Sequence, residues 1–227
     1  TWTRFASGAA REAVIAHPDD TMAYIERYAA EDDALASARR QGQRWDVRPV
    51  SPATGAALRF LATVIGARAV VEIGTGCGGS GLWLLRGMRS GSVLTTVDVD
   101  HACQQFARGA YRRAGFAANR TRLIHGRAQE VLPRLRDAAY DMVFLDADRV
   151  EYPAYLAEVL RVLRPGGIAA YHGALDSDGT RDGPLAAAAD PAGAAVRELG
   201  RLVHEDDTLV PLLLPVGAGL LAAVRTV

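Results

Sequence analysis

The fold of this chain is decided by the stretch Ala-Val-Val-Glu-Ile-Gly-Thr-Gly-Cys-Gly-Gly-Ser-Gly-Leu-Trp-Leu at residues 69–84. Its first residues are largely β-branched, as in a buried parallel strand, and its last residues begin a helix. Gly74, Gly76 and Gly79 lie between them in the spacing G-x-G-x-x-G, which permits a tight turn and close approach of a ligand. The stretch predicts a strand–turn–helix unit that binds a ligand at the turn, although glycine turns also occur for structural reasons alone.

Two acidic residues restrict the kind of ligand. Glu72 stands two positions before Gly74, where a carboxylate repels a dinucleotide pyrophosphate but suits a ligand with an ammonium and a sulfonium. Asp98 ends the next apolar run, about 20 residues after Gly79, where an acid can hold both ribose hydroxyls. An acid at this second place fits NAD or S-adenosylmethionine, and Glu72 favours the latter. A capped helix and a solvated strand end are the purely structural alternative.

The composition describes one ordinary α/β domain. The chain has 227 residues, of which 49% are hydrophobic and 23% charged, so it can bury a sizeable core. Its formal net charge is zero, which gives no sign of nucleic acid or of an acidic membrane as a partner. All 26 basic residues are arginine, so no lysine can act as a base.

Cysteine usage and hydropathy favour a cytoplasmic protein. Cys77 and Cys103 have no metal-ligand spacing and are expected to be free thiols in a reducing compartment. No signal peptide is visible. Residues 209–224 carry no charge, but prolines and glycines interrupt them, so a hairpin of strands is expected there rather than a membrane span.

Apolar runs and helical patterns alternate through the rest of the chain, which predicts parallel strands with helices on both faces. The strands expected are 69–73, 93–97, 122–125, 141–145 and 168–171, followed by a hairpin of 209–216 and 220–224. The helices expected between them are 80–88, 102–114, 128–135, 152–163 and 194–204. Residues 164–167 are expected to form a turn, and 173–190 a long surface loop.

The N-terminal residues are expected to form a helical extension. Residues 19–21 can cap a helix that runs toward Arg40, and residues 39–48 are polar and are expected to form a loop. Ser51 and Pro52 open another helix, which Gly66 ends. We therefore expect an extension over residues 1–50 and one domain over residues 51–227.

Four motifs together resemble a known family. They are Val-Val-Glu-Ile-Gly-Thr-Gly at 70–76, Thr-Val-Asp at 96–98, Phe-Leu-Asp-Ala-Asp at 144–148 and Leu-Arg-Pro-Gly-Gly at 163–167. They resemble class I S-adenosylmethionine-dependent O-methyltransferases of the catechol and caffeoyl-CoA type, and the actinobacterial members most closely, over residues 48–225. The resemblance implies a Rossmann-like, mostly parallel seven-stranded sheet with a C-terminal antiparallel hairpin. It also implies methyl transfer to a hydroxyl of a small acceptor, for which a phenol is one candidate.

The resemblance also implies roles for individual residues. Asp98 matches the acid that holds the ribose, Val99 the neighbour of the adenine, and Asp146 the acid that meets the acceptor or a metal. The cofactor positions that the resemblance implies are Val50, Glu72, Gly74, Thr75, Gly76, Ser80, Asp98, Val99, Ala128, Gln129 and Asp148.

The chemical step is expected at the carboxyl ends of the strands, where Asp146 and Arg149 follow the fourth strand and His172 the fifth. In metal-dependent relatives an Asp-Asn pair after the fifth strand helps to hold a divalent cation. Here His172 and Gly173 take those places, and Mg²⁺ needs oxygen ligands that glycine lacks, so no metal ligands are assigned. His172 is either the base or a strand-end histidine bonded to backbone. Arg149 is either catalytic or paired with a nearby acid.

The sequence leaves three functions open. The first is the O-methyltransferase, with Asp146, His172 and Arg149 as its catalytic residues. The second is a non-catalytic protein that binds S-adenosylmethionine, because two metal-ligand positions are missing. The third is an NAD-dependent oxidoreductase, which Glu72 disfavours. A homodimer is also expected, because Met22, Ile25 and Tyr28 form an apolar helical face outside the alternating core.

Overall fold

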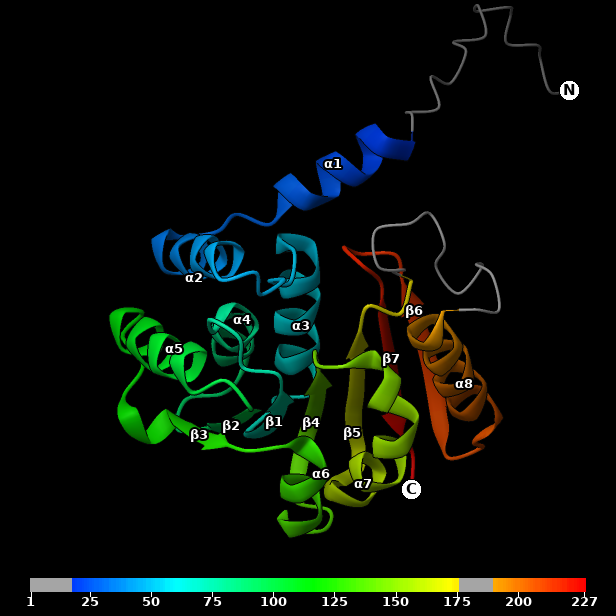
Figure 1. The fold of residues 1–227 in the computed structure, drawn as a ribbon. Coiled ribbons are helices and arrows are strands. Elements are labelled where there is room, and N and C mark those ends of the chain that lie inside the picture. The colour runs from blue at the N-terminus through cyan, green and yellow to red at the C-terminus, as the bar shows by residue number, and fades with distance from the viewer. Residues whose placement is uncertain (1–17, 176–189) are drawn as a thin grey trace, which may run out of the picture.

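The computed structural model describes residues 18–175 and 190–227. Its centre is a seven-stranded sheet in the order β3-β2-β1-β4-β5-β7-β6, with β7 antiparallel to its neighbours (Figure 1). The strands are β1 (Ala69–Ile73), β2 (Val93–Asp98), β3 (Thr121–His125), β4 (Tyr140–Leu145), β5 (Leu163–His172), β6 (Leu209–Leu214) and β7 (Leu220–Arg225). The expected fold class, with its C-terminal antiparallel hairpin, is confirmed.

Helices cover both faces of this sheet (Figure 1). The helices are α1 (Pro18–Tyr28), α2 (Asp33–Arg44), α3 (Pro52–Val64), α4 (Gly79–Gly87), α5 (His101–Arg113), α6 (Ala128–Val131), α7 (Tyr152–Val162) and α8 (Pro191–Glu205). Side chains of α2 to α5 share one buried cluster with one face of the sheet, and α6 to α8 share a second cluster with the other face. None of the helices in these described ranges is long and apolar enough to cross a membrane.

The apolar strands are explained by burial on both faces. In β4, Met142 and Phe144 belong to the cluster on the α3 side, and Val143 and Leu145 to the cluster on the α7 side. All four side chains are fully buried. Each such side chain contributes about 1.5–3 kcal/mol through burial, so the central strands are the rigid part that positions the loops at their ends.

The N-terminal expectation was wrong in one respect. The chain forms two helices, α1 and α2, where one helix toward Arg40 was expected, and α2 continues through most of the expected loop. The break occurs because Asp32 adopts an extended conformation and its carboxylate accepts the Leu35 N–H at 3.0 Å, which starts a new helix. Ser51 caps α3 as expected, accepting the Thr54 N–H.

Two smaller expectations also need correction. Residues 164–167 belong to β5, where the register with β4 shifts and Gly166 has a positive φ of 74°, so an irregular strand replaces the expected turn. The helix expected over 128–135 is α6 followed by a separate 3₁₀ turn, Leu132–Arg134, which contains a proline. Most of the loop expected over 173–190 lies outside the described residues.

Candidate active site

The glycine turn after β1 lies at the carboxyl ends of the central strands. The N–H of Gly74 donates to Val97 O at 2.8 Å, which joins the turn to β2. Gly74 has a φ of +97°, and a Cβ on it would lie 2.0 Å from Asp146 O, so only glycine fits where β1 meets the loop after β4. The N–H of Gly76 donates to Asp98 Oδ2 at 2.8 Å. The turn therefore brings the predicted residues of three strands together.

A first pocket lies over this turn, under the segment that joins α2 to α3. Val50, Thr75, Gly76 and Ser80 line it, as the sequence predicts for the methionine end of a cofactor. The N-terminal residues that close it were missed by the sequence analysis and include Ala38, Gly42, Val47 and Pro49. Their one sequence signal is a glycine within a helix, Gly42, where a Cβ would lie 3.0 Å from Val47 O.

Glu72 stands behind the turn and is fully buried. The hydroxyl of Thr96 donates to its Oε2 at 2.6 Å. Its other oxygen, Oε1, has no partner. Burial raises the pKa of Glu72 to about 8, against the opposing effect of the nearby Thr96 and Ser80 side chains. An unpartnered, buried carboxyl oxygen behind a pocket fits a ligand that brings a cationic donor.

A second pocket of about 440 Å³ opens on the other side of Asp98. Asp98, Val99, Ala128 and Asp148 line it, as expected for the adenosine half of the cofactor. Gln129 is exposed and is not part of this lining. Glu151 and Tyr155 complete the wall and were not predicted; the Tyr155 hydroxyl donates to the Glu151 carboxylate.

A third pocket of about 390 Å³ lies beyond the loop after β4, and it contains the expected catalytic residues Asp146, Arg149 and His172. His172 Nδ1 lies 2.8 Å from Asp146 Oδ1. The side chains of these two residues are 12% and 23% exposed, so the pair is shielded but reachable from the pocket. Asp146 lines all three pockets and therefore marks the point where they meet.

The other polar groups of this pocket are held by the loop itself. Asp148 caps the 3₁₀ turn Arg149–Glu151 by accepting the Val150 N–H. Arg149 Nη1 donates to Gly173 O at 3.5 Å. Tyr152, which the sequence analysis missed, donates to Leu145 O at 3.2 Å and accepts the Ala147 N–H. Tyr152 thus fixes the loop that carries Asp146.

The residues present do not fit the divalent cation of the metal-dependent relatives. The Asp146 carboxylate is engaged by His172, and Gly173 offers no side chain. A Cβ on Gly173 would lie 2.9 Å from Arg149 Cδ, so the arginine occupies the space of the missing ligand. Within residues 18–175 and 190–227 no three His, Cys, Asp or Glu side chains are grouped so that they could hold a metal ion.

The strand order, the glycine turn between two acids and the pockets around it define a class I methyltransferase that uses S-adenosylmethionine. The model of the O-methyltransferase family matches residues 26–226, and the chain belongs to this family.

Individual relatives agree with this family. A candidate O-methyltransferase of Mycolicibacterium vanbaalenii is 50% identical over 214 residues, covering 94% of this chain and 90% of that protein. The crystal structure of a Bacillus cereus O-methyltransferase in complex with SAH has a TM-score of 0.78 and 26% identity, over 91% of this chain and 99% of that one. The O-methyltransferase TomG of Streptomyces achromogenes, in complex with SAM, has a TM-score of 0.77 and 26% identity, over 92% and 96%.

Proposed function

We propose that this O-methyltransferase moves the methyl group of S-adenosylmethionine to the hydroxyl of a small phenolic acceptor, with His172 as the base. The observation that carries the proposal is the His172–Asp146 pair in the third pocket, in which Asp146 also lines the other two pockets. An acceptor in the third pocket would lie beside this pair. The first two pockets would hold the two halves of the cofactor.

The cofactor supplies an electrophilic methyl group on a sulfonium. We assign Glu72, Gly74, Thr75, Gly76, Ser80 and Val50 to its methionine end, with Glu72 Oε1 providing the acceptor for the ammonium. Asp98 would take the ribose hydroxyls, and Val99, Ala128 and Asp148 would surround the adenine. Gln129 would act only at the exposed rim of this site. The two solved relatives named above are in complex with SAH and SAM, which supports S-adenosylmethionine as the ligand of this chain.

The chain's own groups then handle the acceptor proton. The bond between His172 Nδ1 and Asp146 fixes the imidazole ring, and the carboxylate stabilises the charged ring after it accepts a proton at Nε2. As the acceptor oxygen bonds to the methyl carbon, the carbon–sulfur bond breaks and sulfur keeps the electron pair. Arg149 cannot take the proton, and we assign it to orienting the acceptor.

A phenolic acceptor suits a site without a cation. A phenol with a pKa of about 10 is far easier to deprotonate than an aliphatic alcohol, and imidazole titrates near neutral pH. A base of this strength therefore needs an acceptor that is already acidic. A measurement of methyl transfer over a panel of phenols and aliphatic alcohols tests this choice. Turnover of none of them would favour the non-catalytic alternative.

Asp98→Ala is expected to abolish measurable binding of S-adenosylmethionine. It removes the hydrogen bonds of two ribose hydroxyls to a charged acceptor, each of which contributes about 1.5–3 kcal/mol, and it also releases the Gly76 N–H. Titration calorimetry with the full chain measures the affinity. Asp98→Asn keeps one acceptor oxygen and should retain weak binding. Tight binding of NAD by the unaltered protein, with no response to S-adenosylmethionine, would support the oxidoreductase instead.

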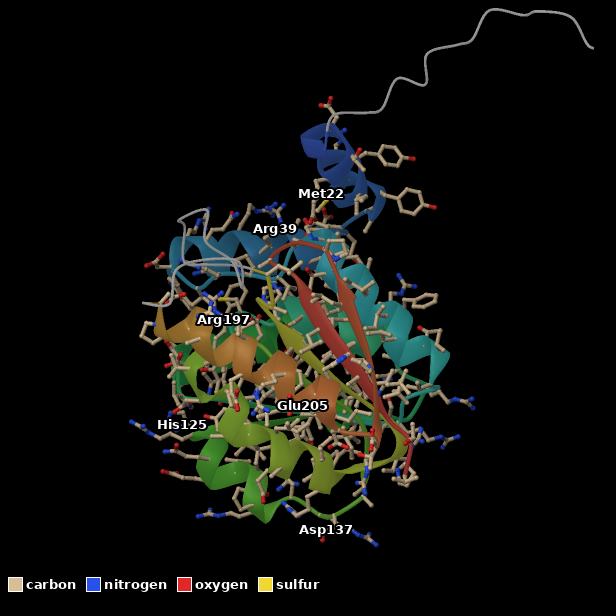
Figure 2. All side chains as sticks on the ribbon, turned by 90° about the vertical axis from the view of Figure 1, so that its right-hand side faces the viewer. Met22, Arg39, His125, Asp137, Arg197 and Glu205 are labelled. Carbon is tan, nitrogen blue, oxygen red and sulfur yellow. The ribbon has the colours of Figure 1, made fainter. Side chains whose placement is uncertain are left out.

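We further propose a homodimer in which the extension over residues 1–50 contacts the partner's methyltransferase domain, residues 51–227. Figure 2 shows α1, which carries Met22, projecting from the body of the molecule. Glu26 ties this helix to α3 by accepting from the Ser51 hydroxyl and the Ala53 N–H. Met22 and Ile25 are partly buried, so the exposed apolar face of α1 is formed by Tyr24 and Tyr28 instead.

The dimer would also use the outer face of α3. Phe60 and Val64 on α3 are 66% and 65% exposed, close to the 62% and 79% of Tyr24 and Tyr28. Large exposed apolar side chains on two helices that contact each other are typical of an interface. We also propose a cytoplasmic location. The two buried cysteines are both free thiols, as is usual in a reducing compartment.

Light scattering of the full chain is expected to give the mass of a dimer. The double substitution Tyr24→Ser and Tyr28→Ser should shift the mass toward the monomer, because it removes the apolar face of α1 without touching Glu26. Val227→Ser, at an exposed apolar residue far along the chain, is the control and should leave the mass unchanged. A monomeric full-length protein would contradict the proposal.

A further inference from the structure

A buried network of hydrogen bonds runs from α5 to the carboxyl group of Glu72. Thr96 on β2 donates to Glu72 Oε2 at 2.6 Å, and the hydroxyl oxygens of Thr96 and Thr75 lie 2.8 Å apart. Gln104 Nε2 on α5 donates to Ile124 O at 2.8 Å and to Thr75 Oγ1 at 3.4 Å. The four residues that contribute side chains to this network are all buried. The network therefore joins the glycine turn to β2, β3 and α5 beneath the surface.

The direction of each hydrogen bond in this network is fixed. A hydroxyl group has one hydrogen, and that of Thr96 goes to Glu72, so the hydroxyl of Thr75 must donate to Thr96. The side-chain nitrogen of Gln104 faces the carbonyl of Ile124, and an amide nitrogen only donates, so Gln104 donates to Thr75. The reverse order would point the Thr75 hydrogen at another donor. Every member of the network therefore directs a hydrogen toward Glu72 Oε2.

The two carboxyl oxygens of Glu72 consequently have different surroundings. Oε2 accepts the hydrogen of Thr96, whereas Oε1 is buried and has no partner. A buried polar atom without a partner costs free energy, and a ligand that supplies a donor removes that cost. Thr75, the member of the network next to Thr96, lines the first pocket, which is assigned above to the methionine end of the cofactor. A carboxyl group held through Oε2 keeps Oε1 for a donor from that pocket.

We propose that Thr96, Thr75 and Gln104 are positioning residues for the ammonium group of S-adenosylmethionine. They act through Glu72, because the network holds the carboxyl group by Oε2 and leaves Oε1 to receive the ammonium. The proposal rests on the assignment of Glu72 to the methionine end of the cofactor. It adds that affinity for the ammonium depends on Thr96 and Gln104, neither of which lines the two pockets assigned to the cofactor.

The test compares two ligands in Thr96→Val, which removes the last donor of the network with little change of shape. S-adenosylhomocysteine carries the ammonium, whereas 5′-methylthioadenosine has the same adenosine and sulfur but no amino-acid end. Calorimetry with the full chain should show S-adenosylhomocysteine bound about 10-fold or more weakly, because a hydrogen bond to a charged acceptor is lost. Binding of 5′-methylthioadenosine should not change. A distorted glycine turn would instead weaken the binding of both ligands.

Matched variants separate the network from its surroundings. Thr96→Ser keeps the hydroxyl group and should restore the affinity for S-adenosylhomocysteine. Thr95→Val makes the same substitution at the preceding buried residue of β2, whose side chain points to the other face of the sheet, and should change neither affinity. Gln104→Met removes the first donor and should weaken binding of S-adenosylhomocysteine about threefold. Gln105→Met, at the exposed neighbour of Gln104, should have no effect.

Two results would overturn the proposal. They are an unchanged affinity of Thr96→Val for S-adenosylhomocysteine, and an equal loss of affinity for both ligands. If Thr96→Val does not fold, Gln104→Met decides by the same comparison of the two ligands. Glu72→Gln shows which assignment has failed. If it binds S-adenosylhomocysteine as tightly as the unaltered protein does, the assignment of Glu72 is wrong. If it binds more weakly and Thr96→Val does not, only the role of the network is wrong.

Discussion

His172→Ala is expected to lower turnover by about a hundredfold or more, with little change in cofactor affinity. The substitution removes the proposed proton acceptor, and neither an arginine nor any lysine can replace it. Cofactor affinity should hold because His172 lines the third pocket and neither of the two pockets assigned to the cofactor. Single-turnover kinetics together with calorimetry separate the two quantities.

Two companion variants distinguish a catalytic role from a structural one. Asp146→Asn keeps the shape of the pair but removes the charge that stabilises protonated His172, so it should lower turnover and shift the pH profile of the rate. His204→Ala changes an exposed histidine on α8 and should leave the rate unchanged. Turnover by His172→Ala close to that of the unaltered enzyme would contradict the assignment.

The same proposal predicts weak dependence on divalent metal. A chelator should leave most activity intact, because His172 and Gly173 replace two ligands of the metal-dependent relatives. If chelation abolished turnover and magnesium restored it, Asp146, Asp148 and His172 would have to be reconsidered as a rearranged metal site.

The sequence predicted the parts of the site that the sheet positions. Glu72, Asp98, Asp146 and His172 each lie at or just beyond the end of a strand, and parallel strands bring their carboxyl ends together whatever the loops do. The glycine spacing also predicted the turn after β1, because the structure leaves no room for a side chain at Gly74. The position of each residue along its own strand was therefore enough to predict that these residues lie close together.

The residues that the sequence did not predict depend on contacts between distant segments. Ala38, Gly42 and Val47 close the first pocket only because α2 packs against α4 and α5, and small or apolar residues in a helix carry no local sign of this. Tyr152 was expected only as the start of a helix, yet its hydroxyl fixes the loop that carries Asp146. The break between α1 and α2 was missed because Asp32 caps a helix within a run that also fits one longer helix.

Glu72→Gln is expected to remove a large dependence of stability on pH. Burial raises the pKa of Glu72 to about 8 in the folded protein, against an ordinary value of 4.5. Between these values the unfolded chain releases a proton that the folded chain keeps, so the free energy of unfolding falls as pH rises. The loss is on the order of 5 kcal/mol at most and is complete above the folded pKa. Glutamine stays neutral and does not titrate.

Denaturant unfolding of the ligand-free protein from pH 5 to pH 9 measures this difference. The unaltered protein should lose stability over that range relative to Glu72→Gln, and the variant should be the more stable of the two near pH 8. Parallel curves for the two proteins would show that the carboxyl group is already ionised in the folded state. Other groups titrate equally in both, so the difference between the curves isolates Glu72.

S-adenosylmethionine should bind Glu72→Gln more weakly than it binds the unaltered protein, and this should reverse the difference in stability between the two. If the ammonium of S-adenosylmethionine meets Oε1, binding favours the ionised carboxylate and must expel its proton below about pH 8. Calorimetry near pH 7 in buffers of different ionisation enthalpy should then detect close to one proton released by the unaltered protein and fewer by Glu72→Gln, which should also bind more weakly. Equal proton release by both proteins would show that Glu72 does not meet the cofactor. Glu72 would then have only a structural role behind the glycine turn.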